Sequence, residues 1–379
     1  MDVPLRKPRS WAEPLRNLDP ILLATVLGLT VVGLFMIYSA THQSLETLHV
    51  DTATFVKRQV AALVVALALM VFMASLDYRL VKVYSGLFYA GMLVLLFLVK
   101  TPLGSAAKGA QRGFYIAGFQ FTPSEWMKVA MIAFLASYLS ELKRQGHLTL
   151  RDVMRSTLIA AVPMFLVFIQ PDIGTTIVLA TVLVAVLVLA GARFRHLGIL
   201  AVAAVVLLVG AFQVGLVKDY QKARLLGFLD PENSPQAAIY NQSQSEITIG
   251  SGGMFGTGYL RGTQTNLDFV PEQHTDFIFT VVGEEFGFVG GVVVLLFYAI
   301  LLWRALRVAM LSKDPFGTYL ATGVAATFAI QMFVNIGMTV GIMPITGIPL
   351  PFVSYGGSSL IASYMAIGLL LSIQLRRGA

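Results

Sequence analysis

Long apolar runs alternate with short polar segments along most of the 379-residue chain. A helix needs about 20 predominantly apolar residues to cross the hydrocarbon core of a bilayer, so runs of this length predict membrane spans. Ten such runs cover residues 20–40, 59–76, 80–99, 124–140, 153–169, 174–191, 196–217, 277–303, 316–342 and 359–375. The pattern therefore predicts an all-α polytopic membrane protein with ten transmembrane helices.

One polar segment is much longer than the others and separates the seventh apolar run from the eighth. It divides the chain into five predicted parts: an N-terminal segment (1–19), helices one to seven (20–217), a long loop (218–276), helices eight to ten (277–375) and a short tail (376–379). The loop ends in His274-Thr275-Asp276. So long a polar insertion in so apolar a chain makes the loop and its terminal carboxylate the first candidates for chemistry.

Charge placement predicts the orientation of the chain. Most of the 27 Lys and Arg residues fall in segments on the same side of the predicted spans as the N-terminus. Membrane proteins carry an excess of Lys and Arg in their cytoplasmic segments, so we expect both termini in the cytoplasm and the long loop outside. The first apolar run exceeds the roughly 7–15 residues of a signal-peptide core, which predicts a retained anchor in the cytoplasmic membrane.

Composition excludes several classes of protein. The chain is 56% hydrophobic and only 12% charged, whereas soluble domains are usually about 25% charged. The absence of Cys removes disulfides and thiolate metal sites, and the five His residues lack the paired spacing of a zinc site. The net charge of +7 lies mainly in short loops between apolar runs, so we do not expect nucleic acid binding.

Proline and glycine interrupt the chain before the last predicted span. Residues 343–358 cannot form one regular helix, because they include Pro344, Pro349, Pro351, Gly356 and Gly357. Irregular backbone at membrane depth is tolerated only where protein buries it or water reaches it. We therefore expect a cavity that opens outward near this segment.

Two ionisable residues lie within the fourth predicted span. Charges inside spans are costly and are therefore functional candidates. Glu125 and Lys128 are three residues apart, so both side chains share one helix face and can pair. The pair either supports the structure or holds a polar group of a substrate.

Other acidic residues have structural explanations. Asp172 follows Pro171 and, together with Thr175, can cap the sixth helix, which we favour over direct catalysis. Glu284 and Glu285 lie near the start of the eighth span, where a polar tie to a neighbouring helix is the favoured interpretation.

The predicted outer segments carry cations with two possible roles. Lys108, Arg112 and Arg224 could contact anionic headgroups. They could also hold a phosphorylated lipid, because arginine matches phosphate oxygens with a bidentate fork.

The long loop contains further signals. Ser234 as an N-cap and Pro235 at the first helical position predict a helix over residues 235–249. Five glycines between 250 and 258 predict a close approach of the backbone to a ligand, a sharp turn, or a flexible linker. At the end of the loop, Asp276 is either an N-cap, a role that Thr275 could equally fill, or a general base in a partly desolvated cleft.

Four motifs together resemble the SEDS family of membrane proteins (shape, elongation, division and sporulation). They are Gln-Pro-Asp-Ile-Gly-Thr at 170–175, Ile-Gly-Ser-Gly-Gly at 249–253, His-Thr-Asp-Phe-Ile-Phe at 274–279 followed by two glutamates, and Pro-Leu-Pro-Phe-Val-Ser-Tyr-Gly-Gly-Ser at 349–358. The match covers nearly the whole chain in family order. Residues 229–232 and 261–264 look like the RodA branch of cell elongation, whereas residues 282–285 are closer to the FtsW branch of division.

The resemblance implies a ten-helix peptidoglycan glycosyltransferase of the inner membrane. Its substrates would be lipid II and an undecaprenyl-linked glycan, its partner a class B penicillin-binding protein, and its cofactor a divalent cation, Mg²⁺ or Mn²⁺. The resemblance also assigns roles: Asp276 as the catalytic residue; Lys108, Arg112, Glu125, Lys128, Arg224, His274 and Thr275 as substrate contacts; and Asp172, Glu285, Ser354 and Gly356 as structural or cavity residues.

The chemistry requires one base and positive charge for the leaving group. Asp276 would take a proton from the acceptor hydroxyl while cations stabilise the departing pyrophosphate. Two alternatives are a transporter that flips lipid II through a path of intramembrane charges, and a scaffold that only positions the penicillin-binding protein.

Overall fold

A computed structural model describes residues 18–377 except 103, 108–109, 117–118, 143–147, 216, 218 and 231–233. The helices of this part of the chain are α1 (Pro20–Thr47), α2 (Thr54–Ser75), α3 (Tyr78–Val99), α4 (Pro123–Leu142), α5 (Leu150–Ile169), α6 (Ile173–Leu189), α7 (Phe194–Gln213), α8 (Asp219–Leu229), α9 (Gln236–Ser251), α10 (Thr263–Asn266), α11 (Ile278–Met310), α12 (Pro315–Thr339) and α13 (Gly357–Leu375). The strands are β1 (Ser105–Ala107), β2 (Ala110–Ile116) and β3 (Phe119–Phe121).

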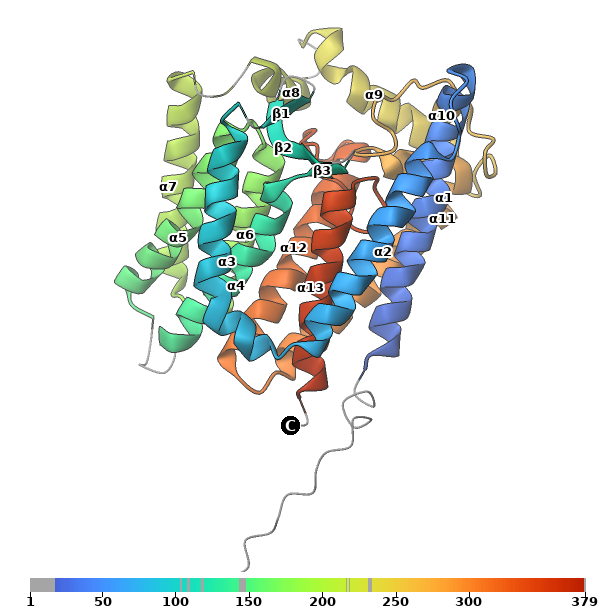
Figure 1. The fold of residues 1–379 in the computed structure, drawn as a ribbon. Coiled ribbons are helices and arrows are strands. Elements are labelled where there is room, and N and C mark those ends of the chain that lie inside the picture. Colours follow the sequence, from blue (N-terminus) through green and yellow to red (C-terminus); the bar gives the residue numbers. More distant parts are fainter. Residues whose placement is uncertain are drawn as a thin grey trace, which may run out of the picture.

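The long helices form a bundle that confirms the predicted polytopic helical fold (Figure 1). Each predicted apolar run overlaps one of these helices. Eight of the described helices are long and apolar enough to cross a membrane. The other two are α6, which has only 17 residues, and α4, which carries Glu125 and Lys128. The count of ten crossings therefore stays a prediction.

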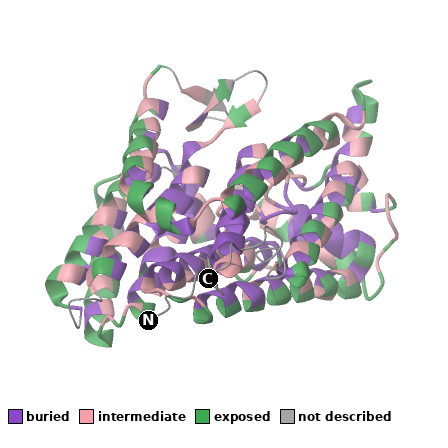
Figure 2. Cartoon of the chain, turned by 60° about the horizontal axis from the view of Figure 1, so that its bottom comes forward, coloured by how far each residue is buried: buried purple, intermediate pink, exposed green. Residues whose placement is uncertain are grey.

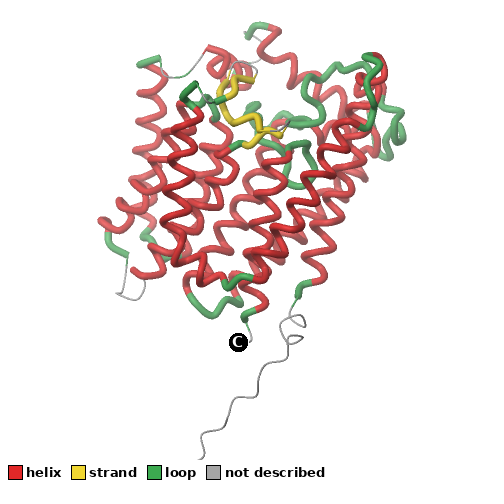
Figure 3. Tube along the Cα trace, viewed as in Figure 1, coloured by secondary structure: helices red, strands yellow, loops and turns green. Residues whose placement is uncertain are grey.

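The ends of the bundle differ. Three short strands, absent from the sequence-based prediction, form an antiparallel sheet between α3 and α4. Figure 3 shows this sheet at the same end of the bundle as the loops around α9. We call this the loop end. Helix α9 confirms the helix predicted in the long loop, but Ser234 is not its cap, because the Ser234 hydroxyl donates to the Asp230 carbonyl at 2.8 Å.

Burial follows from the position of each helix in the bundle. Nearly all of α13 is buried, and α12 and α4 are also mostly buried. Exposed residues cover the outward faces of the surrounding helices (Figure 2). These exposed faces are apolar, as expected for surfaces that meet lipid instead of water.

The glycine-rich stretch of the long loop packs against α11. Helix α11 is kinked at Gly287, whose φ of 64° and ψ of −159° are not helical. Around this kink the Thr257 amide donates to the Glu284 carbonyl at 2.9 Å, and the Phe288 amide donates to the Gly253 carbonyl at 2.9 Å. A Cβ on Gly256 would lie 2.1 Å from the Glu285 carbonyl oxygen. The glycines thus allow a close approach to a helix backbone, and Gly253, Gly256 and Gly258 adopt positive φ in the turns that were one of the predictions. The contact with a ligand stays a prediction.

Two buried glutamates hold the same loop in place. Glu284 accepts hydrogen bonds from the Gln264 amide at 2.7 Å and from the Thr265 amide at 2.9 Å. Glu285 accepts one from the Leu260 amide at 3.0 Å and another from the hydroxyl of Ser39 on α1. The predicted polar ties are confirmed, and they join α11 to the loop as well as to a neighbouring helix.

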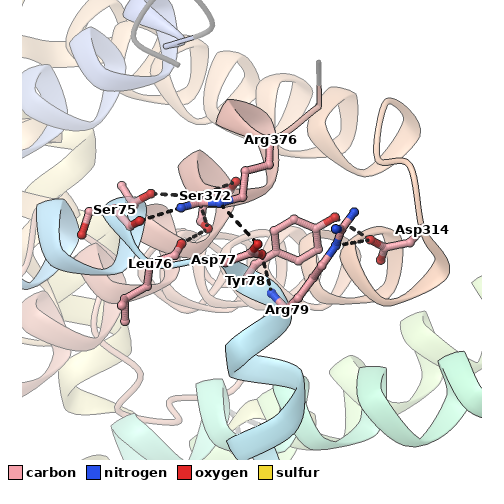
Figure 4. Close-up of polar contacts among 9 residues, drawn as sticks. Ser75, Leu76, Asp77, Tyr78, Arg79, Asp314, Ser372 and Arg376 are labelled. Carbon is pink, nitrogen blue, oxygen red and sulfur yellow. Dashed lines mark hydrogen bonds and ion pairs between the residues drawn. The ribbon is translucent and has the colours of Figure 1, made fainter. Parts of the chain in front are cut away.

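Polar contacts fasten the end opposite to the loop end (Figure 4). Arg376, just after α13, donates to the Ser75 carbonyl at 2.5 Å and to the Ser372 hydroxyl at 2.9 Å. The Tyr78 hydroxyl donates to Asp314, the N-cap of α12, at 2.5 Å. The turn between α2 and α3 is therefore joined to both α12 and α13.

Close packing of α13 on α2 predicts that alanine substitution at two glycines changes the stability of the protein in opposite ways. A Cβ on Gly368 would lie 2.6 Å from the Met70 carbonyl oxygen, whereas a Cβ on Gly91 of α3 meets nothing within 4 Å. Alanine favours a helix over glycine by about 1 kcal/mol, but overpacking costs about 1–3 kcal/mol. We expect Gly368→Ala to lower the thermal unfolding midpoint and Gly91→Ala to leave it unchanged or raise it. Equal midpoints for the two variants would contradict this packing.

Candidate active site

A cavity of about 670 Å³ lies at the loop end of the bundle. Its wall is formed by α2, by the strands, by the first residues of α4 and α6 and the residues just before them, and by residues between 347 and 361. Charged groups in the wall are Arg58, Arg112, Glu125 and Asp172. The cavity can therefore accommodate a substrate that carries both polar and charged groups.

The irregular segment between α12 and α13 confirms the predicted break and its cavity. Gln59 of α2 is buried and supports this segment with both ends of its amide. Its Nε2 donates to the Ser354 carbonyl and its Oε1 accepts from the Gly356 amide, each at 3.2 Å. The Ser354 hydroxyl accepts from the Leu350 amide at 2.8 Å, and Gly356 is the N-cap of α13. Ser354 and Gly356 are thus structural residues of the break, and Gly356 also lines the cavity.

Asp276 lies beside the cavity wall and is half-buried. A Cβ on Gly347 would lie 3.2 Å from the Asp276 Oδ2, and Gly347 is itself part of the wall. Gly347 has a φ of 72°, a left-handed conformation that glycine adopts without strain. The absence of a side chain at this position therefore leaves space between the carboxylate and the cavity.

Asn335 of α12 fixes the backbone around this carboxylate. Its buried Nδ2 donates to the Asp276 carbonyl at 2.8 Å and to the Ile348 carbonyl at 2.7 Å. One amide therefore joins the end of the long loop to the irregular segment.

The prediction that Thr275 or Asp276 caps α11 is wrong. The N-cap is Phe277, which has no side-chain cap hydrogen bond. The Thr275 hydroxyl instead donates to the Glu272 carbonyl at 3.2 Å. The role of Asp276 as a general base stays a prediction. The ring of His274 lies 4.8 Å from that of Phe55, a residue of the cavity wall, measured between centroids.

The three predicted cations, Lys108, Arg112 and Arg224, differ in their position relative to the cavity. The Arg112 Nη2 donates to the Pro171 carbonyl at 2.6 Å, while its buried Nε has no partner in the described part of the chain. Arg224 lies on α8 and does not line the cavity as the described residues define it. Lys108 lies outside the described residues. Arg112 is thus the predicted cation with a donor group available at the site.

The remaining predicted residues are paired. The Lys128 Nζ lies 2.8 Å from the Glu125 Oε2, which confirms the predicted ion pair. Both side chains are buried, and of the two only Glu125 lines the cavity. Asp172 is the N-cap of α6 and accepts from the Thr175 amide at 3.0 Å, as predicted. A role of these groups in substrate binding stays a prediction.

Sequence reasoning missed four residues of this region: Arg58, Gln59, Asn335 and Tyr355. Burial raises the pKa of the Tyr355 phenol, although nearby Arg58 opposes that rise. Arg58 follows Lys57 at the edge of an apolar run, where basic residues indicate the orientation of the chain in the membrane. The two amides carry no charge, but a lone Gln or Asn in a membrane span is itself a signal of a polar contact.

Fold and site together define a polytopic helical membrane protein with a charged cavity at one end of its bundle and a carboxylate beside it. The chain belongs to the FtsW/RodA/SpoVE family, whose model, described as cell cycle protein, matches residues 20–378. The resemblance seen in the motifs is therefore confirmed.

Similar proteins come from both branches of the family. The peptidoglycan glycosyltransferase MrdB of Escherichia coli K12 is 37% identical over 95% of this chain and 94% of its own length. The probable peptidoglycan glycosyltransferase FtsW of Trichlorobacter lovleyi is 38% identical over 97% of this chain and 95% of its own. A chain from a structure of a peptidoglycan synthase complex, titled for the coordination of polymerization and crosslinking, has a TM-score of 0.78, 29% identity, and coverage of 95% and 98%.

The hydrogen bonds of Asn335 predict that its replacement lowers both stability and activity. Asn335→Leu leaves the Asp276 and Ile348 carbonyls without this donor, and each buried unsatisfied group costs about 1–3 kcal/mol. We expect a lower thermal unfolding midpoint and lower enzymatic activity. The control is Gln331→Leu, one turn earlier on α12, where the described structure records no side-chain hydrogen bond. Identical behaviour of the two variants would argue against a positioning role for Asn335.

Proposed function

We propose that this protein is a peptidoglycan glycosyltransferase that polymerises lipid II into glycan strands. The observation that carries the proposal is the half-buried Asp276 carboxylate against Gly347, at the wall of a cavity that also holds Arg58 and Arg112. The glycosyltransferase names of relatives that match nearly the whole chain support the reaction. MrdB and the motifs of the RodA branch favour a role in cell elongation.

Asp276 acts as the general base in this proposal. It removes the proton from the 4-hydroxyl of the GlcNAc unit of lipid II, and the resulting oxygen nucleophile attacks the anomeric carbon of MurNAc on the lipid-linked glycan. The new glycosidic bond forms as the bond to undecaprenyl pyrophosphate breaks. A single displacement inverts the anomeric carbon and needs one base, with positive charge in place of the second carboxylate used in glycoside hydrolysis.

Positive charge at the cavity stabilises the leaving group. Arg112 is oriented by the Pro171 carbonyl, and its Nε points to no other acceptor in the described structure. Arg58 is exposed on the cavity wall. Arginine binds pyrophosphate oxygens through its planar fork of donors, and such preorganised charges act where negative charge develops.

A divalent cation, Mg²⁺ or Mn²⁺, would enter together with the substrate. The described residues contain no group of three His, Cys, Asp or Glu side chains that could hold a metal ion. Mg²⁺ is commonly bound by one or two carboxylates plus substrate phosphates, and Asp276 and Asp172 are carboxylates in or beside the wall. Such an ion would neutralise charge on the pyrophosphate.

The membrane setting and partner follow from the same proposal. The apolar helices and the relatives indicate an integral protein of the inner membrane. The positive residues of the predicted inner segments support an orientation with the loop end and its cavity outside and both termini in the cytoplasm. The synthase complex with a similar chain supports a class B penicillin-binding protein as the partner that crosslinks the new strands.

Replacing the proposed base gives the most direct functional prediction. Asp276→Asn keeps the shape of the side chain but cannot take the proton, so lipid II polymerisation by the purified protein should fall about 100- to 10,000-fold. Glu125→Gln serves as the comparison, because a flippase with an intramembrane charge path would depend on the Glu125–Lys128 pair instead. Full polymerisation by Asp276→Asn would contradict the proposal, and lipid II movement without chain growth in the wild type would favour the flippase.

Removal of divalent cations tests the proposed metal requirement. A chelator should slow polymerisation at least about tenfold, which corresponds to a loss of about 1.4 kcal/mol of transition-state stabilisation. Added Mg²⁺ or Mn²⁺ should restore the rate. The thermal unfolding midpoint of the substrate-free protein should not change, because the ion is proposed to enter with the pyrophosphate. Polymerisation at the full rate in chelator would exclude the requirement.

A further inference from the structure

A second, smaller pocket lies at the end of the bundle opposite to the cavity. It has a volume of about 80 Å³ and is enclosed by Asp19 at the start of α1, by the last turns of α11, and by residues 373–377 at the end of α13. Its charged lining consists of Asp19, Arg304, Arg307 and Arg377. The reaction proposed above uses none of these residues.

Two of the four charges neutralise each other. Asp19 accepts hydrogen bonds from the Ile21 and Leu22 amides at 3.1 Å each, and it accepts a further one from the Arg304 Nε at 2.5 Å. Asp19 and Arg304 are both buried. This pair therefore closes the start of α1 against α11 and leaves no net charge of its own.

The other two charges remain for a ligand. Arg307 and Arg377 are exposed, and within the described part of the chain no acceptor is recorded for either guanidinium group. The Oε1 of Gln374, which also lines the pocket, is buried without a hydrogen-bond partner. Because the two ends of a glutamine amide can exchange places by a flip, this group offers a donor or an acceptor. A buried polar group without a partner calls for a water or a ligand.

The surroundings of the pocket resemble a membrane interface. Trp303 is 55% exposed, and the Arg304 guanidinium lies 5.5 Å from the centre of its ring. Leu306 and Met310 are exposed on the same part of α11. Tryptophan is enriched at the headgroup level of membranes, so the pocket opens at the depth of lipid phosphates with apolar side chains beside it.

We propose that this pocket binds the phosphate group of an anionic membrane phospholipid. Arg307 and Arg377 bind the phosphate oxygens, and the acyl chains lie along the exposed apolar residues of α11. Basic pockets between transmembrane helices on the cytoplasmic side commonly bind such headgroups. A free phosphate ion offers the same oxygen atoms, but it would make no use of the apolar surface.

The alternative explanation is that Arg307 and Arg377 only add positive charge to the predicted cytoplasmic side. Arg193 and Arg195 provide a matched control, since both are exposed at the same end of the bundle, Arg193 as the N-cap of α7 and Arg195 in its first turn. Neither lines the pocket. Losing this second pair removes equal charge without changing the proposed site.

The test is native mass spectrometry of the full-length purified protein titrated with phosphatidylglycerol or with phosphatidylcholine. The variants are Arg307→Gln/Arg377→Gln and Arg193→Gln/Arg195→Gln. We expect the wild type to retain one phosphatidylglycerol more tightly than phosphatidylcholine. The pocket variant should lose at least about tenfold in affinity, because both guanidinium groups proposed to bind the phosphate are removed. The control variant should change less than about twofold.

Two further measurements keep the outcome interpretable. Circular dichroism of both variants checks the fold, and Arg304 is left unchanged because it pairs with buried Asp19. Inorganic phosphate at equal concentration should not displace the lipid; complete displacement would assign the pocket to free phosphate and overturn the lipid proposal. Equal losses in the two variants, or no selective retention by the wild type, would also overturn it.

Discussion

The need to hydrogen-bond backbone groups inside a bilayer governs the rest of this structure. Helices satisfy that need internally, so the irregular segment between α12 and α13 requires partners from elsewhere. Gln59 and Asn335 supply them: each amide bonds two backbone groups, and together they join α2, α12, the end of the long loop and the irregular segment. These bonds hold the irregular segment at the cavity wall, and those of Asn335 fix the backbone of Asp276 beside it.

Buried charged groups, like buried backbone groups, need partners. Most buried charges have structural partners: Glu284 holds the long loop, Asp172 caps α6, and Glu125 pairs with Lys128. Two arginines, Arg58 and Arg112, line the cavity, and two others, Arg307 and Arg377, line the small pocket; each keeps a donor without a partner or an exposed side chain. Both places lie at ends of the bundle, where headgroups and lipid-linked sugars are found. The distribution suits an enzyme whose substrates and surroundings are anionic lipids.

Much of the fold could be predicted because membrane spans follow directly from apolar length, and the break at residues 343–358 follows from its prolines. Local rules succeeded at Asp172, which caps the Thr175 amide three residues later, but failed at Thr275, because α11 begins after Phe277 and Thr275 lies two residues before that N-cap position. The strands were missed since they are short and lie in a polar segment. The sequence does not show that the glycines at 250–258 pack against α11, because the kink at Gly287 that they contact lies about 30 residues later. Contacts between segments that are distant in the sequence produce no repeating pattern of residues from which they could be predicted.

A structure with lipid II or a non-reactive analogue bound tests the central claim most directly. The account predicts that the acceptor 4-hydroxyl lies within about 2.6–3.2 Å of an Asp276 carboxylate oxygen, the distance over which a general base can take a proton. The pyrophosphate should lie on the side of Arg58 and Arg112. Binding of the sugars away from the 670 Å³ cavity, with Asp276 out of reach of any substrate hydroxyl, would contradict the account.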